Sequence, residues 1–77
     1  MKDLSKYIES ILDGVNKGLN VTKDGDTYII TITKKNFFYH QSDKSFITLS
    51  DSITIRRNLE IYFPNDDIKF EIKHIFV

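Results

Sequence analysis

One dipeptide, Asp24-Gly25, constrains the fold of this chain more than any other feature of its sequence. Both turn positions of a tight β-hairpin need positive φ, and Asp-Gly is the strongest short signal for such a turn. It lies at the centre of LNVTKDGDTYIITIT, whose apolar residues fall on one side when the two halves pair. An antiparallel hairpin is therefore predicted over about residues 19–33. The predicted partners are Lys23 with Asp26, Val21 with Tyr28 and Leu19 with Ile30.

An amphipathic helix is predicted before this hairpin, over about residues 4–17. Large apolar residues recur there at the three- and four-residue spacing of one helical face, and charged or polar residues occupy most other positions. The apolar face consists of Leu4, Tyr7, Ile8, Ile11, Leu12 and Val15.

Two further hairpins are predicted, over about residues 37–50 and 53–77. The first is expected to turn at residues 43–44 and the second at residues 65–66, where polar turn-forming residues interrupt apolar stretches. In the second hairpin, one register places the apolar residues of both strands on a single face. Its pairs are Phe63 with Ile68, Ile61 with Phe70 and Leu59 with Ile72.

The segment 52–63 also fits a second helix, which Pro64 would end. Residues on its apolar stripe would be Ile55, Leu59, Tyr62 and Phe63. The β-branched run at residues 53–55 favours a strand instead, because two substituents on Cβ pack well on a pleated surface. The strand is the interpretation adopted for the fold class.

Together these elements predict a single small α+β domain over residues 1–77. One N-terminal amphipathic helix packs on a five- to six-stranded antiparallel meander sheet. Seventy-seven residues are near the lower limit at which an apolar core folds a chain without disulfides or metal. The chain is cysteine-free and begins with a charged segment, not an apolar signal region, so a cytoplasmic location is expected.

A second apolar patch is expected on the face of the sheet that a single helix cannot cover. Leaving it exposed would forgo several kcal/mol of burial energy, so a partner protein, a second copy of the chain or the folded-over middle hairpin is expected to cover it. The patch consists of Ile29, Phe38, His40, Ile47 and Leu49.

Charge is predicted to separate between the two ends of the sheet, although the net charge is zero. An acidic end of this kind would fit a basic groove on another protein. The hairpin tips would gather Asp24, Asp26, Asp43, Asp66 and Asp67. A basic end beside aromatic rings has a composition found in binders of single-stranded nucleic acid. That end would carry Lys34, Lys35, Arg56 and Arg57.

No catalytic or metal-binding motif is recognisable in the sequence. His40 and His74 lie on different predicted hairpins, and they lack the spacing of a metal site. The three glycines are scattered, so no phosphate-binding loop is formed. Neither a metal, a cofactor nor enzymatic activity is expected.

These expectations favour a small non-catalytic protein-binding module. By analogy of size and class, it would act as an inhibitor, like the small accessory proteins of phages and mobile elements that bind and block a larger host protein. One alternative is a nucleic-acid-binding domain that uses the basic and aromatic end of the sheet. The other is a structural subunit that forms homo-oligomers.

Overall fold

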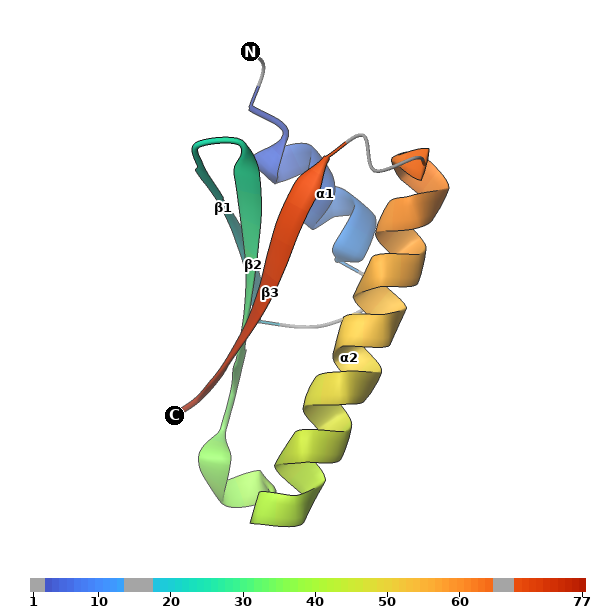
Figure 1. Ribbon diagram of the computed structural model, residues 1–77. Coiled ribbons are helices and arrows are strands. Elements are labelled where there is room, and N and C mark those ends of the chain that lie inside the picture. Colours follow the sequence, from blue (N-terminus) through green and yellow to red (C-terminus); the bar gives the residue numbers. More distant parts are fainter. Residues whose placement is uncertain (1–2, 14–17, 65–67) are drawn as a thin grey trace.

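The computed structural model describes residues 3–13, 18–64 and 68–77. Two helices cover one face of a three-stranded sheet, so the protein has two layers (Figure 1). The elements in chain order are α1 (Ser5–Leu12), β1 (Leu19–Asp24), β2 (Thr27–Lys34), the short 3-10 helix η1 (Asn36–Phe38), α2 (Gln41–Tyr62) and β3 (Lys69–Phe76).

The sheet is mixed, with strand order β1-β2-β3. β2 pairs antiparallel with β1 and parallel with β3. A parallel neighbour requires a crossover connection that returns along the whole sheet, and α2 provides it. The predicted five- to six-stranded antiparallel meander is therefore wrong, because the chain after β2 forms a helix and then a parallel strand.

The first predicted hairpin is confirmed, although its register differs. Asp24 pairs with Thr27, and Val21 lies opposite Ile30, two residues beyond its predicted partner. Gly25 occupies the first loop position with a φ of +61°, a conformation that glycine adopts without strain. Because the displacement is an even number of residues, every side chain keeps its predicted face of the sheet.

The second and third predicted hairpins are wrong. Residues 37–50 form η1 and the first half of α2, and the expected first strand of the hairpin over 53–77 forms the second half of α2. The alternative helix over 52–63 is the better interpretation, although α2 begins earlier, at Gln41. The expected turn at residues 65–66 lies outside the described residues.

Several β-branched residues occur within α2, and the helix satisfies the hydroxyl groups of its threonines internally. The Thr48 hydroxyl donates to the Lys44 carbonyl (2.6 Å), and the Thr54 hydroxyl donates to the Ser50 carbonyl (3.0 Å). Each β-branched residue disfavours a helix by less than about 1 kcal/mol. Burial of one large aliphatic side chain contributes about 1.5–3 kcal/mol, so packing outweighs the local preference for a strand.

The core lies between the sheet and the two helices. Alternate residues of β2 face the helices, and the buried residues of each helix are four positions apart. The core consists of Ile8, Leu12, Val21, Tyr28, Ile30, Ile32, Ile55 and Leu59.

The predicted N-terminal helix is present as α1. It spans Ser5–Leu12, and residues 14–17 of the predicted helix lie outside the described ranges. The Asp3 carboxylate accepts hydrogen bonds from the Ser5 N–H (2.9 Å) and hydroxyl (2.6 Å), which satisfies a free amide at the start of the helix. Among residues 3–13, 18–64 and 68–77, no helix has the length and apolarity that a membrane crossing requires.

Replacing Leu59 by alanine is expected to lower the free energy of unfolding by about 3 kcal/mol, because its side chain is fully buried. Ile61→Ala is the matched control, since Ile61 is exposed on the outer side of the same helix, and it should change stability by less than about 0.5 kcal/mol. Urea unfolding of both variants measures the difference. If the two variants lose equal amounts of unfolding free energy, the assignment of this segment to a helix would be contradicted. An antiparallel hairpin would turn both residues toward the core.

Candidate functional site

β3 forms one edge of the sheet, and β2 is its only partner among the described strands. The ladder continues to Val77, whose N–H donates to the Lys34 carbonyl (2.8 Å) and whose carbonyl accepts from the Asn36 N–H (2.7 Å). Backbone groups of successive residues point to opposite sides of a strand. The N–H and C=O groups of Phe70, Ile72 and His74 therefore point away from β2, where a further strand can pair with them.

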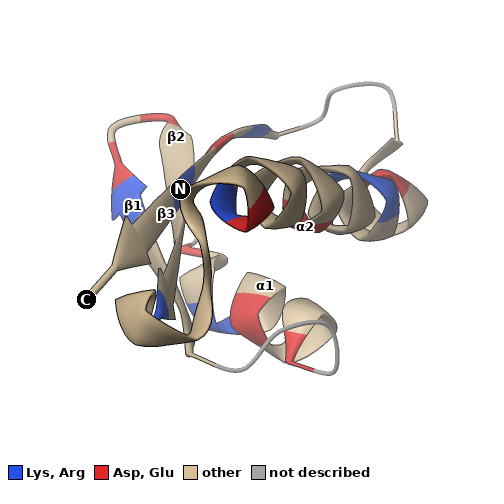
Figure 2. Ribbon diagram, turned by 90° about the horizontal axis from the view of Figure 1, so that it is seen from below, with Lys and Arg blue, Asp and Glu red and all other residues tan. Residues whose placement is uncertain are grey.

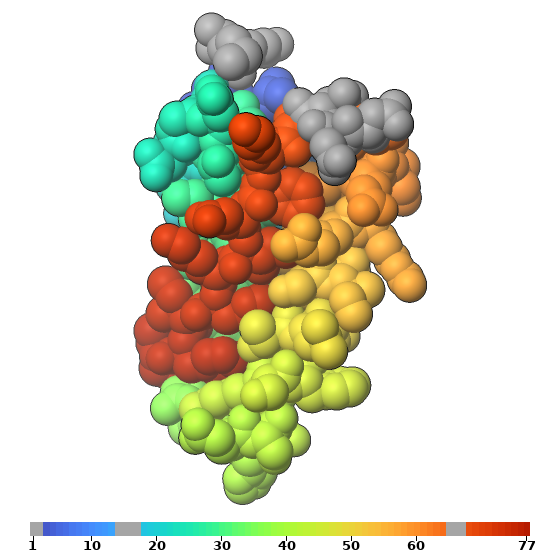
Figure 3. Space-filling model, in the orientation of Figure 1, coloured from blue at the N-terminus to red at the C-terminus, as the bar shows by residue number. Residues whose placement is uncertain are grey.

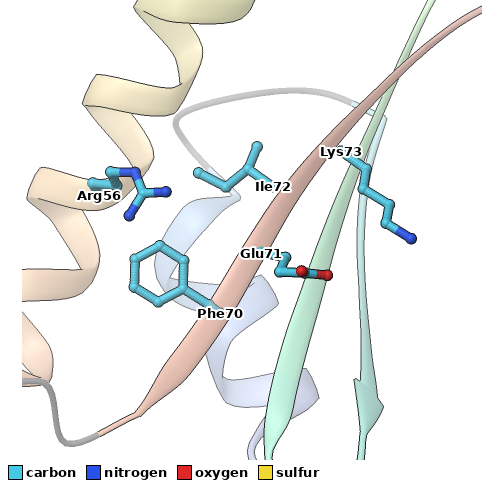
Figure 4. Close-up of a pocket in the computed structure, with 5 residues that line it drawn as sticks. All are labelled: Arg56, Phe70, Glu71, Ile72 and Lys73. Atoms are coloured by element: carbon cyan, nitrogen blue, oxygen red, sulfur yellow. The ribbon is translucent and has the colours of Figure 1, made fainter.

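A shallow depression of about 310 Å³ lies between this edge strand and α2 (Figure 4). Phe70 and Ile72 point toward α2, and Glu71 and Lys73 lie on the other side of the strand. We call this depression the β3–α2 groove. It is lined by Arg56, Phe70, Glu71, Ile72 and Lys73.

Arg56 provides the positive charge on the helix side of the groove. Its guanidinium carbon lies 5.2 Å from the centre of the Phe70 ring, which is a cation–π distance. The ion pairs of the described residues do not include Arg56. Stacking on Phe70 orients the guanidinium, and its N–H groups remain free to bind a carboxylate.

The edge of β3 is accessible at the molecular surface. In the space-filling view, the residues of β3 form a continuous red strip that α2 borders along one side (Figure 3). Lys69, Glu71 and Lys73 of this strand are exposed. The groove and the free backbone groups beside it are therefore open to a partner.

A second polar cluster lies where β2, β3 and α2 meet. The Lys34 Nζ atom is 2.8 Å from Asp51 Oδ2, and His74 Nε2 is 3.8 Å from the same oxygen. The His74 side chain is only 6% exposed, and neither Asp51 Oδ2 nor His74 Nε2 has an aligned hydrogen bond. Burial disfavours the charged imidazole and holds the pKa of His74 below its usual value, while the Asp51 charge opposes this shift and Lys34 reinforces it.

Aromatic rings flank this cluster. The Lys34 ammonium lies 5.8 Å from the Tyr39 ring, which packs edge-on against Phe76 at 5.9 Å. Lys44 of α2 lies 5.4 Å from the Phe76 ring. Because Asp51 is engaged by Lys34, the cluster fits a structural contact between α2 and the sheet better than an acid–base site. Within residues 3–13, 18–64 and 68–77, no three metal-ligating side chains form a group that could hold a metal ion.

The residues of the predicted apolar patch do not lie on one surface. Ile29 is half-buried on the sheet face opposite the helices, Phe38 is exposed in η1, and His40 directly precedes α2. Ile47 and Leu49 both belong to α2, where Ile47 is half-buried and Leu49 is exposed. They are separated because residues 41–49 form a helix and not the strand on which the patch was based.

The predicted acidic residues are also divided. Asp24 and Asp26 flank Gly25 at the exposed turn between β1 and β2. Asp43 lies in the first turn of α2, at the opposite end of the molecule (Figure 1). The remaining two predicted residues, Asp66 and Asp67, lie outside the described ranges.

The four predicted basic residues do not form one basic surface. Lys34 is paired with Asp51, and Arg56 stacks on a ring in the β3–α2 groove. Lys35 and Arg57 are exposed, but Lys35 precedes η1 and Arg57 lies in α2. Figure 2 shows the Lys and Arg positions spread over the sheet and α2.

The sequence analysis identified Arg56 as a candidate contact and predicted a strand that includes Phe70 and Ile72, but it assigned that strand the wrong partner. Phe70 and Ile72 alternate with charged residues, which is the pattern of a half-buried strand. In the predicted hairpin this strand pairs with residues 59–63, so no free edge beside a helix is expected there. Asp51 was missed as well, although it lies one helical turn before Ile55 and would share the inward face of a longer helix.

Similarity to known proteins gives no guidance on function. No family model, curated protein or solved structure matches this chain. The arrangement of the side chains is therefore the basis for the functional inference.

Buried His74 predicts that folding stability decreases as the pH falls below about neutral. Its pKa in the folded chain is lower than the ordinary value of 6.5, so the unfolded chain binds the proton first as the pH is lowered. The stabilising contribution of the neutral imidazole is complete above pH 6.5 and is lost as the pH falls toward the folded pKa. Urea unfolding at a series of pH values measures this loss.

Substituting His74→Gln should flatten the pH dependence in this range, because the only group in the cluster with a lowered pKa is removed. His40→Gln is the matched control, since His40 is exposed, and it should retain the wild-type dependence. If the free energy of unfolding of His74→Gln depended on pH as in the wild type, His74 could not be the source of the pH dependence.

Proposed function

We propose that the protein is a non-catalytic protein-binding module that accepts an extended segment of a partner protein along β3. The observation that carries this proposal is the β3–α2 groove beside the free edge of the strand. In strand addition, main-chain hydrogen bonds hold the segment, and its alternate side chains enter neighbouring pockets. β3 offers the hydrogen-bonding groups, and the groove offers the pocket.

The lining of the groove suggests which segment would bind. Side chains of the added strand that point toward α2 would contact Phe70 and Ile72, so an apolar side chain is favoured there. Side chains two positions apart share a face of a strand. An acidic residue two positions from the apolar one would be close enough to pair with Arg56.

Charges on the other side of β3 support selectivity. Lys69, Glu71 and Lys73 alternate in sign along the strand and are exposed. Charged residues on an edge strand discourage indiscriminate pairing with other chains. A segment with the complementary order of charges would be preferred over others.

Binding of this kind requires only main-chain contacts and a pocket, so it needs no catalytic group. If the protein acts as a phage or mobile-element inhibitor, the blocked host protein would supply the extended segment. The absence of cysteine is compatible with a reducing cytoplasm, and we place the interaction there.

Selection from a displayed library of random peptides tests the proposal directly. Enriched peptides should combine an apolar and an acidic residue two positions apart, and their binding should shift the NMR signals of the β3 amides. Arg56→Glu should weaken the binding of the enriched peptides by at least about tenfold, because a charge-assisted hydrogen bond is lost.

The neighbouring substitution Arg57→Glu makes the same change of charge outside the groove and should leave peptide binding unchanged. Failure to enrich any peptide would contradict the proposal. Signal changes confined to residues away from β3 and the groove would contradict it as well.

A further inference from the structure

The outer face of α2 carries an apolar stripe that the sheet does not cover. Phe46, Leu49 and Ile53 are 73%, 61% and 44% exposed. They are spaced three and four positions apart, so they lie along one face of the helix. We call these three residues the α2 stripe. By contrast, the inward face of the same part of α2 carries Lys44 and Asp51.

Opposite charges flank the two ends of the α2 stripe. Asp43 lies one turn before its first residue, and Arg57 lies one turn after its last. Both are exposed, and the ion pairs within the described ranges include neither. Figure 2 shows charged positions near both ends of α2 and a largely uncharged stretch between them.

We propose that the α2 stripe is the interface of a two-fold symmetric homodimer, in which the α2 helices of two copies pack antiparallel. With the two-fold axis between residues 49 and 50, Phe46 of each copy lies opposite Ile53 of the other, and Leu49 lies at the centre. In this register Asp43 lies one residue from the position opposite Arg57, close enough for the two side chains to pair, and this contact occurs twice.

A second copy of this chain fits the α2 stripe because a two-fold interface must be complementary to itself. The order acid, apolar stripe, base meets that requirement only in the antiparallel orientation. A parallel pair of helices would bring Asp43 next to Asp43 and Arg57 next to Arg57, which is repulsive. The antiparallel orientation also opposes the two helix dipoles.

This dimer does not depend on the β3–α2 groove. The α2 stripe lies on the outer face of the helix, and the groove lies between the helix and β3. Dimerisation would leave both grooves open, so one dimer would hold two extended segments. A partner with two such segments would then bind with increased avidity.

Analytical ultracentrifugation of the full chain over a wide range of protein concentration tests this inference. The wild type should shift from monomer to dimer as the concentration rises. Leu49→Glu should raise the dimer dissociation constant by at least about tenfold, because it places a charge at the centre of the interface. Ile61→Glu is the matched control on the same helix, beyond the overlap of the two stripes, and should dimerise like the wild type.

Charge exchange distinguishes this geometry from other dimers. Asp43→Arg alone and Arg57→Asp alone should each weaken self-association, since each homodimer then contains two like-charged pairs. An equal mixture of the two variants should form a heterodimer that restores two attractive pairs.

A wild type that remains monomeric at all concentrations would overturn the inference. A dimer that survives Leu49→Glu with unchanged affinity would also overturn it, as would a mixture of the charge variants that shows no preference for the heterodimer. Circular dichroism confirms that each variant is folded. Peptide binding in the groove is measured separately, so either proposal can fail without the other.

Discussion

The parallel pairing of β2 with β3 determines how the rest of the chain is arranged. After β2 ends, the chain must return along the sheet before β3 can run in the same direction. α2 has 22 residues and spans about 33 Å, which is longer than an eight-residue strand of about 26 Å. The crossover helix therefore covers one face of the sheet, and β3 is placed at an edge.

α2 is attached to the sheet in two different ways along its length. Its second half contributes Ile55 and Leu59 to the core, and its first half is linked through Asp51 to Lys34. A partly buried ion pair adds little net stability, because desolvation opposes the attraction. This part of the helix turns Lys44 and Asp51 inward, whereas Phe46, Leu49 and Ile53 lie on the outer face and form the α2 stripe.

The elements that could be predicted from the sequence are those with local signals. Asp24-Gly25 marks the hairpin of β1 and β2, and the regular apolar spacing marks α1. The second half of α2 was recognised only as the alternative helix over 52–63. The first half was missed because polar residues such as Asp51 face inward and apolar residues such as Leu49 face outward, so the helical period is obscured. The parallel pairing of β3 left no local signal either, since it joins residues that are far apart in the chain. Arg56 was predicted as a possible nucleic-acid contact. Its place in the β3–α2 groove could not be predicted, because the groove forms only when β3 pairs with β2 in parallel.

Amide hydrogen exchange along β3, followed by NMR, tests the central claim of a parallel edge strand most directly. The account predicts alternating protection: the amides of Glu71, Lys73 and Ile75 exchange slowly because they point toward β2, and those of Phe70, Ile72 and His74 exchange quickly. The amides of residues 45–62 should be protected as well, as expected for a helix. Uniform protection along β3, or rapid exchange throughout residues 45–62, would contradict the fold and remove the basis for the groove.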